Sequence, residues 1–103
     1  MSDVRDKLAQ HIEEALTALL AEVGDMEAGL PEIVLDVPRH KDHGDFACNA
    51  ALQLAKRLRR PPREIAGELV ARLGDAGGLV ARAEVAGPGF VNVWLAEDRK
   101  SVV

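Results

Sequence analysis

With 103 residues, the chain can form one small domain with a modest hydrophobic core and is too short for a second. Hydrophobic residues make up 48% and charged residues 29%, which is typical of a soluble globular protein and excludes an intrinsically disordered chain. The formal net charge of -4 gives no general attraction for a polyanion, so a nucleic-acid partner would require a local basic surface.

The first third of the chain predicts one long helix and a short strand. Apolar residues recur at helical spacing through residues 3–23, and Gly24 can end that helix. Residues 25–31 are rich in turn formers. The apolar, β-branched segment 33–37 is predicted to be a strand, which Pro38 ends.

A polar loop, residues 39–44, separates this strand from two further predicted helices. Asp45 stands where a helix N-cap is expected, so we predict a second helix over residues 46–58. The proline pair at 61–62 breaks that helix and suits the first turn of a third helix, which Gly74 ends.

The last part of the chain predicts an antiparallel β-hairpin of residues 79–86 and 90–95, joined by the turn Gly87-Pro88-Gly89. In the first strand, alternation places Leu79, Ala81, Ala83 and Val85 on one side and Val80, Arg82 and Glu84 on the other. The predicted fold class is α+β, a small antiparallel β-sheet packed against about three α-helices. We assign residues 1–95 to this domain and expect residues 96–103 to begin a linker.

Acidic and basic residues are separated along the chain. Residues 1–36 carry nine acidic and two basic residues, whereas residues 37–63 carry two acidic and seven basic residues. Five of the basic residues gather around the break between the second and third helices: Lys56, Arg57, Arg59, Arg60 and Arg63. Such a cluster can clamp the phosphates of a nucleic acid. Cations that merely complement the dipole of a solvated helix end are the alternative interpretation.

The final strand carries an uncommon set of side chains on one face. A period of two places Phe90, Asn92 and Trp94 together, opposite an aliphatic face suited to the core. An aromatic ring can stack on an unstacked base, and an amide can pair with a base edge through both its donor and its acceptor. The alternative is that Phe90 and Trp94 pack into a second small hydrophobic core and that Asn92 forms a hydrogen bond with the backbone.

The loop before the second helix contains several potential metal ligands: His40, Asp42, His43, Asp45 and Cys48. Their spacing matches no compact zinc motif, so we predict no metal site. We instead expect Gly44 to allow a sharp turn, and the exposed side chains of His40, Lys41 and His43 to meet phosphates. No catalytic residue is predicted, because the sequence contains no phosphate-binding glycine loop, nucleophile elbow or paired zinc-protease histidines.

The single cysteine and the hydropathy of the chain both bear on where the protein is expected in the cell. Cys48 has no partner for an internal disulfide, which favours a reducing compartment. The first residues show no secretory leader, and no apolar run approaches the length of a membrane span. We therefore expect a cytoplasmic protein.

Three sequence motifs together resemble the N-terminal (additional) domain of arginyl-tRNA synthetases. They are Asp42-His43-Gly44-Asp45-Phe46-Ala47-Cys48-Asn49 with Ala51-Leu52-Gln53-Leu54-Ala55-Lys56, then Pro62-Arg63-Glu64-Ile65-Ala66, and finally Val85-Ala86-Gly87-Pro88-Gly89-Phe90-Val91-Asn92. Their order and spacing fit the family, and the likeness covers essentially the whole chain, the first helix matching only in pattern. Phe46 and Phe90 stand where tyrosine is also common, a change that preserves stacking.

The resemblance implies a domain that precedes a class I Rossmann catalytic domain and binds the elbow of tRNA(Arg). By position, Phe90 and Asn92 would recognise a base of the D-loop. The candidates for tRNA backbone contact are Lys41, His43, Lys56, Arg59, Arg60 and Arg63. The residues expected to shape the site without touching tRNA are Gly44, Asp45, Gly87, Pro88 and Gly89.

The resemblance also implies the chemistry of a larger enzyme. Such synthetases ligate arginine to tRNA with ATP and magnesium, and they need bound tRNA even to activate the amino acid. The class I signatures His-x-Gly-His and Lys-Met-Ser-Lys-Ser are absent from this sequence and would lie beyond Val103. The family thus implies no cofactor in this domain, with tRNA(Arg) and its own catalytic domain as partners and neither membrane nor DNA expected.

Two other functions fit the same residues. One is a protein-interaction domain whose acidic first helix docks a partner helix, and the other is a free-standing RNA-binding protein with the same fold. Salt-dependent binding of tRNA would separate the protein-interaction domain from the two RNA-binding functions.

Overall fold

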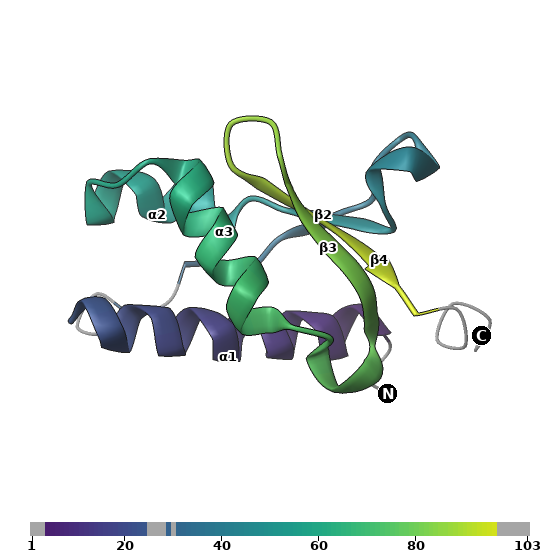
Figure 1. The fold of residues 1–103 in the computed structure, drawn as a ribbon, viewed down its shortest axis with the longest axis horizontal. Coiled ribbons are helices and arrows are strands. Elements are labelled where there is room, and N and C mark those ends of the chain that lie inside the picture. Colours follow the sequence, from purple (N-terminus) through teal and green to yellow (C-terminus); the bar gives the residue numbers. More distant parts are fainter. Residues whose placement is uncertain (1–3, 25–28, 30, 97–103) are drawn as a thin grey trace.

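The computed structural model describes residues 4–24, 29 and 31–96, and within them it has three α-helices and a four-stranded sheet (Figure 1). The helices are α1 (Val4–Val23), α2 (Ala50–Leu58) and α3 (Pro62–Leu73). The strands are β1 (Leu35–Asp36), β2 (Phe46–Cys48), β3 (Val80–Ala86) and β4 (Phe90–Leu95). Two short 3-10 helices complete the chain, η1 (Lys41–His43) and η2 (Ala76–Gly78). The predicted α+β class is confirmed.

β4 lies at the centre of the sheet, whose strand order is β1-β2-β4-β3 and whose neighbours are all antiparallel. Asn92 of β4 lies opposite Ala47 of β2 on one side and opposite Glu84 of β3 on the other. Phe90 lies opposite Ala86. Side chains alternate between the two faces of the strand, so these residues share one face and their neighbours point to the core.

The three helices cover the other face of the sheet. α3 packs against α1, α2 and both hairpin strands, and an ion pair between Arg72 and Glu22 links α3 to α1. The largest fully buried side chains come from all these layers: Leu8, Ile12, Leu16, Leu19, Leu20, Leu54, Ile65, Leu69, Val91 and Val93. Each such leucine or isoleucine withdraws enough apolar surface from water to stabilise the fold by roughly 1.5–3 kcal/mol. The opposite face of the sheet therefore remains available to a ligand.

Asp45 does not cap a helix, and this prediction is wrong. Residues 46–48 form β2, and the helix begins only after Asn49. The Asp45 N–H donates to the carbonyl of Val93 at 2.7 Å, and its Oδ2 accepts from the N–H of Leu95 at 2.8 Å. The segment is extended because pairing with β4 satisfies its backbone groups, so Asp45 joins two strands instead of starting a helix.

Two strand predictions also need correction. The strand expected over residues 33–37 is limited to Leu35–Asp36, the part that finds partners on β2. In β3, a register shift between Val80 and Arg82 turns Val80 to the core, where it is only 5% exposed, although simple alternation places it with Arg82. The long first helix, the proline-initiated third helix and the hairpin are confirmed. No helix within the described ranges combines the length and apolar character needed to cross a bilayer.

Candidate functional site

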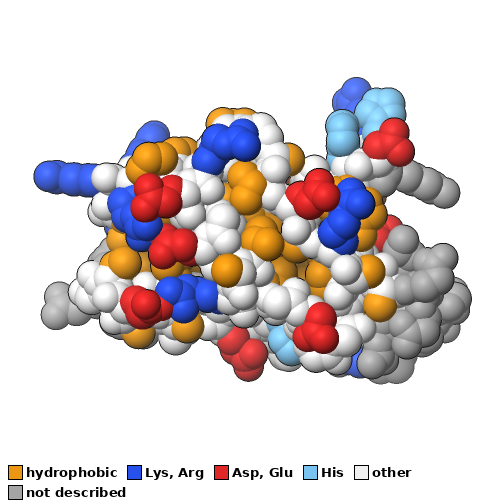
Figure 2. Space-filling view, in the orientation of Figure 1, with side chains coloured by type: hydrophobic (Ala, Val, Ile, Leu, Met, Phe, Trp, Pro, Cys, Tyr) orange, Lys and Arg blue, Asp and Glu red, His pale blue; other side chains and the backbone are white. Residues whose placement is uncertain are grey.

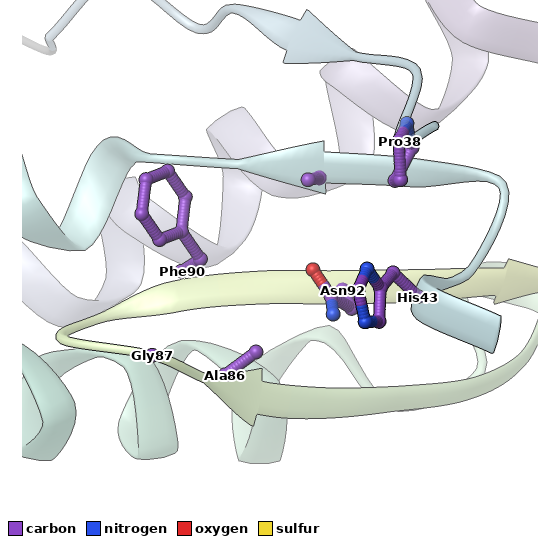
Figure 3. Close-up of a pocket in the computed structure, with 7 residues that line it drawn as sticks. Pro38, His43, Ala86, Gly87, Phe90 and Asn92 are labelled. Atoms are coloured by element: carbon purple, nitrogen blue, oxygen red, sulfur yellow. The ribbon is translucent and has the colours of Figure 1, made fainter. Parts of the chain in front are cut away.

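The uncovered face of the sheet carries an open pocket with a volume of about 320 Å³ (Figure 3). The close-up looks onto this face, with the helices behind the strands. Seven residues from the loop after β1, from η1, β2 and the hairpin line the pocket: Pro38, His43, Ala47, Ala86, Gly87, Phe90 and Asn92. The pocket brings together four residues that the sequence singles out, namely His43, Gly87, Phe90 and Asn92.

The pocket exists because small side chains surround Asn92. Ala47 stands opposite Asn92, and Ala86 stands opposite Phe90, so neither neighbouring strand fills the space above β4. Asn92 is 9% exposed, and its side-chain amide makes no hydrogen bond with any residue that the structure describes. The amide opens into the pocket, so its donor and its acceptor are both available to a ligand.

His43 forms the wall of the pocket opposite Phe90 (Figure 3). It ends η1, where its N–H donates to the carbonyl of His40 at 3.0 Å, and the two imidazole rings meet edge to face with 5.8 Å between centroids. Gly44 follows with φ of +97°, and a Cβ there would lie 2.7 Å from the carbonyl oxygen of Val93. The predicted need for glycine at this turn thus has a physical basis in both conformation and close approach. Lys41 lies in η1, but its side chain lies outside the described part of the structure.

The Gly87-Pro88-Gly89 turn is held against the junction of α2 and α3. Arg63 donates from Nη1 to the carbonyl oxygen of Gly87 at 2.6 Å. A Cβ at Gly89 would lie 2.5 Å from Cβ of Pro62 and 3.2 Å from Cδ2 of Leu52. The turn that precedes Phe90 therefore packs directly on the helices, which fixes the position of the aromatic ring.

The basic cluster at the α2–α3 junction divides into paired and exposed cations. Arg60 pairs with Glu64 and with Glu68, the latter at 2.7 Å, and its hydrogen bond to Glu64 raises the pKa of its guanidinium. Lys56 and Arg59 are exposed near the end of α2. Figure 2 accordingly shows Lys and Arg side chains interspersed with Asp and Glu over α2 and the start of α3. This surface is mixed in charge, not uniformly basic.

Sequence reasoning did not find Pro38, Ala47 and Ala86 as pocket residues. Their contribution is the absence of bulk, which becomes visible only once β2 is known to pair with β4. Among the residues that the structure describes, no group of three or more His, Cys, Asp or Glu side chains is arranged to hold a metal ion.

Residues 6–95 match the family described as the arginyl tRNA synthetase N terminal domain. The arginine–tRNA ligase of Thioalkalivibrio sulfidiphilus is 50% identical over 99 residues, which cover 94% of this chain and 16% of that protein. The ligase of Syntrophotalea carbinolica is 44% identical over 92 residues, which cover 89% of this chain and 17% of that protein. The chain thus spans about one sixth of the length of these curated relatives.

Solved structures give the same result. The arginyl-tRNA synthetase of Thermus thermophilus is similar with a TM-score of 0.61 and 31% identity, covering 87% of this chain and 14% of that one. The enzyme of Plasmodium falciparum has a TM-score of 0.76 at 14% identity, covering 95% of this chain and 17% of that one, which supports the fold alone. By its sequence over residues 6–95 and by its fold, the chain belongs to the family of arginyl-tRNA synthetase N-terminal domains.

Proposed function

We propose that this chain is the tRNA-recognition domain of an arginine–tRNA ligase, and that its sheet pocket receives one base from the D-loop of tRNA(Arg). The observation that carries the proposal is the amide of Asn92, which opens into the pocket between the ring of Phe90 and the imidazole of His43 (Figure 3). The family membership supports the proposal independently, since the matched relatives are tRNA ligases.

Each wall of the pocket has a part in this binding. The base stacks on Phe90, while the Asn92 amide donates to and accepts from its edge. His43 lies on the other side, where an imidazole can donate to the base or meet its phosphate. Ala47 and Ala86 leave the necessary space. Such pairing requires a base that has left its helical stack, as bases in tRNA loops do.

Backbone contacts come from cations of the α2–α3 junction, outside the pocket. Lys56 and Arg59 are exposed and suited to phosphate, whereas Arg60 shares its charge with two glutamates. The remainder of the ligase would supply the sites for arginine, ATP and magnesium, and this chain contributes no residue to them. Such an enzyme works where tRNA is used, in the cytoplasm.

The test of base recognition is binding of a tRNA(Arg) transcript to the 103-residue chain, measured by fluorescence anisotropy. Phe90→Ala and Asn92→Ala are each expected to weaken binding by about 1–3 kcal/mol, the contribution of one lost base stack or base-edge contact. Phe90→Tyr retains the stack and should bind like the original chain. Asn92→Asp keeps the shape of the side chain but removes its donor, so it should bind weakly.

Val34→Ala serves as the control for a lost apolar side chain, because Val34 is 40% exposed and does not line the pocket. Circular dichroism verifies that every variant is folded. Unchanged tRNA affinity in both alanine variants, with folding intact, would refute base recognition and favour a protein-docking role for the domain.

A further inference from the structure

A second arrangement of aromatic and polar groups lies on the same open face, beyond the pocket. Arg82 of β3 stands opposite Trp94 of β4, and its Cζ lies 4.0 Å from the centroid of the indole ring. Its Nε also lies 2.9 Å from Oε2 of Glu84. The guanidinium is therefore held over the ring by a cation–π contact and is also paired with a carboxylate.

Arg82 is held in place yet remains accessible. Its side chain is 57% exposed, and its two Nη groups make no hydrogen bond with the residues that the structure describes. It is also the sole lysine or arginine in the four described strands. An arginine fixed by stacking offers its remaining N–H groups in a set direction, at a smaller loss of side-chain entropy than a free one.

We propose that Arg82, supported by Trp94, binds the phosphate of a nucleotide adjacent to the one in the Phe90–Asn92 pocket. This inference rests on the proposed tRNA binding and extends its contact surface along β4. Phe90 and Trp94 are four residues apart on one strand, which corresponds to about 13 Å. Arg82 therefore lies within reach of the backbone that leaves the pocket.

Phosphate is favoured over a base at this position. The guanidinium covers the indole face, so Trp94 does not offer that face to a base. The free Nη groups of an arginine match the oxygens of a phosphate in spacing and charge. Glu84, directly opposite Asn92, places a negative charge beside the pocket. That charge disfavours phosphate over Asn92, whereas at Arg82 it is paired with the guanidinium, whose two Nη groups stay open to a phosphate.

The deciding measurement is the dependence of tRNA(Arg) affinity on salt concentration. Arg82→Ala should weaken binding about tenfold, within the range of a lost cationic contact. It should also lower the slope of log affinity against log salt by roughly 0.7, the contribution of one phosphate on a single strand. Arg82→Lys keeps the charge and should retain most of the slope, although it loses the guanidinium contact with Trp94.

Arg72→Ala is the matched control, because Arg72 is also paired with a glutamate but lies in the helical layer.

Trp94 provides a direct spectroscopic probe of binding, since it is the one tryptophan of the chain. Its indole N–H signal in an NMR spectrum should shift on addition of tRNA, and this shift should shrink in Arg82→Ala.

The outcomes separate this inference from the proposed function. If Phe90→Ala and Asn92→Ala weaken binding while Arg82→Ala behaves like Arg72→Ala, Arg82 only covers Trp94 and the second contact is refuted. If Arg82→Ala alone reduces affinity and salt slope, the phosphate contact stands and base recognition in the pocket fails. If the unmodified chain shifts no signal with tRNA, both are overturned.

Discussion

Arg63 is connected to the candidate site through the backbone of the hairpin turn. Its position in the basic cluster makes it a candidate for phosphate contact, but in the structure its Nη1 donates to Gly87, a residue of the pocket wall. The bond connects α3 to the turn that precedes Phe90. Arg63 is thus placed to position the aromatic ring, whatever its contribution to tRNA phosphates.

Arg63→Gln tests this positioning role. Because the expected defect is a displaced turn and not a lost phosphate contact, tRNA affinity should fall while the salt slope stays unchanged, and Arg63→Lys should restore part of the affinity. Arg59→Gln, on the exposed end of α2, should lower the slope by roughly 0.7. Equal reductions of slope in the two glutamine variants would assign Arg63 to phosphate contact.

At the scale of elements, the hairpin and the α2–α3 junction act as one unit through Gly89. A Cβ at this position would lie 2.5 Å from Cβ of Pro62, so something must shift to accept it. The turn would separate from the helices, and Phe90 would move with it. Gly67, within α3, is the contrasting glycine, because a Cβ there meets nothing within 4 Å.

Gly89→Ala is expected to destabilise the fold by about 1–3 kcal/mol, the usual cost of forcing a side chain into an occupied core. It should also weaken tRNA binding. Gly67→Ala should raise the free energy of unfolding by about 0.5–1 kcal/mol and leave binding unchanged, since alanine favours a helix over glycine. Urea denaturation gives both values, and a neutral Gly89→Ala would show that the turn is not constrained by the helices.

The elements that sequence alone predicts are those whose signals are local. The helical period of α1, the proline start of α3 and the turn between β3 and β4 each occupy one continuous stretch. β2 has no such signal, because Phe46-Ala47-Cys48 pairs with a strand more than 40 residues later, and a polar residue before an apolar run favours a helix N-cap. The bulge that turns Val80 inward is equally set by its partner strand.

The same distinction applies to the site. Phe90 and Asn92 share one face through alternation along a single strand, so the sequence alone places them together. The pocket itself depends on Ala47 and on His43, which reach Asn92 through the long-range pairing of β2 with β4. Likewise, the hydrogen bond from Arg63 to Gly87 joins residues 24 positions apart. The sequence shows the charge of Arg63 but does not predict this contact with the hairpin turn.

The stability of the whole molecule should depend on pH through the buried thiol of Cys48. It lies on the core side of β2 with 0% exposure, and burial raises the pKa of its thiol above the ordinary value. The unfolded chain loses this proton first, at a pH near 8.5. The contribution of this group to stability is therefore fully present below that pH and is lost as the pH rises toward the folded pKa.

Urea denaturation between about pH 7 and about pH 10 should show this alkaline loss of stability. Cys48→Ala removes the titrating group and should reduce the loss, at the cost of lower stability throughout because of the small cavity. The thiol of the original chain should react with a maleimide no faster than the chain unfolds. Identical alkaline losses in both proteins would assign the effect to other groups.

The central position of β4 has a consequence for how the proposed recognition of a base by Asn92 can change. Asn92 is carried by a strand that is paired on both sides, so its backbone cannot move without disrupting the sheet. A loop-borne contact can be retuned by insertions or altered turns, whereas this one cannot. A new preference must come from exchanging the side chain at position 92, or at His43 facing it. On the proposed function, a change in the base that is recognised therefore requires substitution of Asn92 or His43, while the sheet that carries Asn92 stays the same.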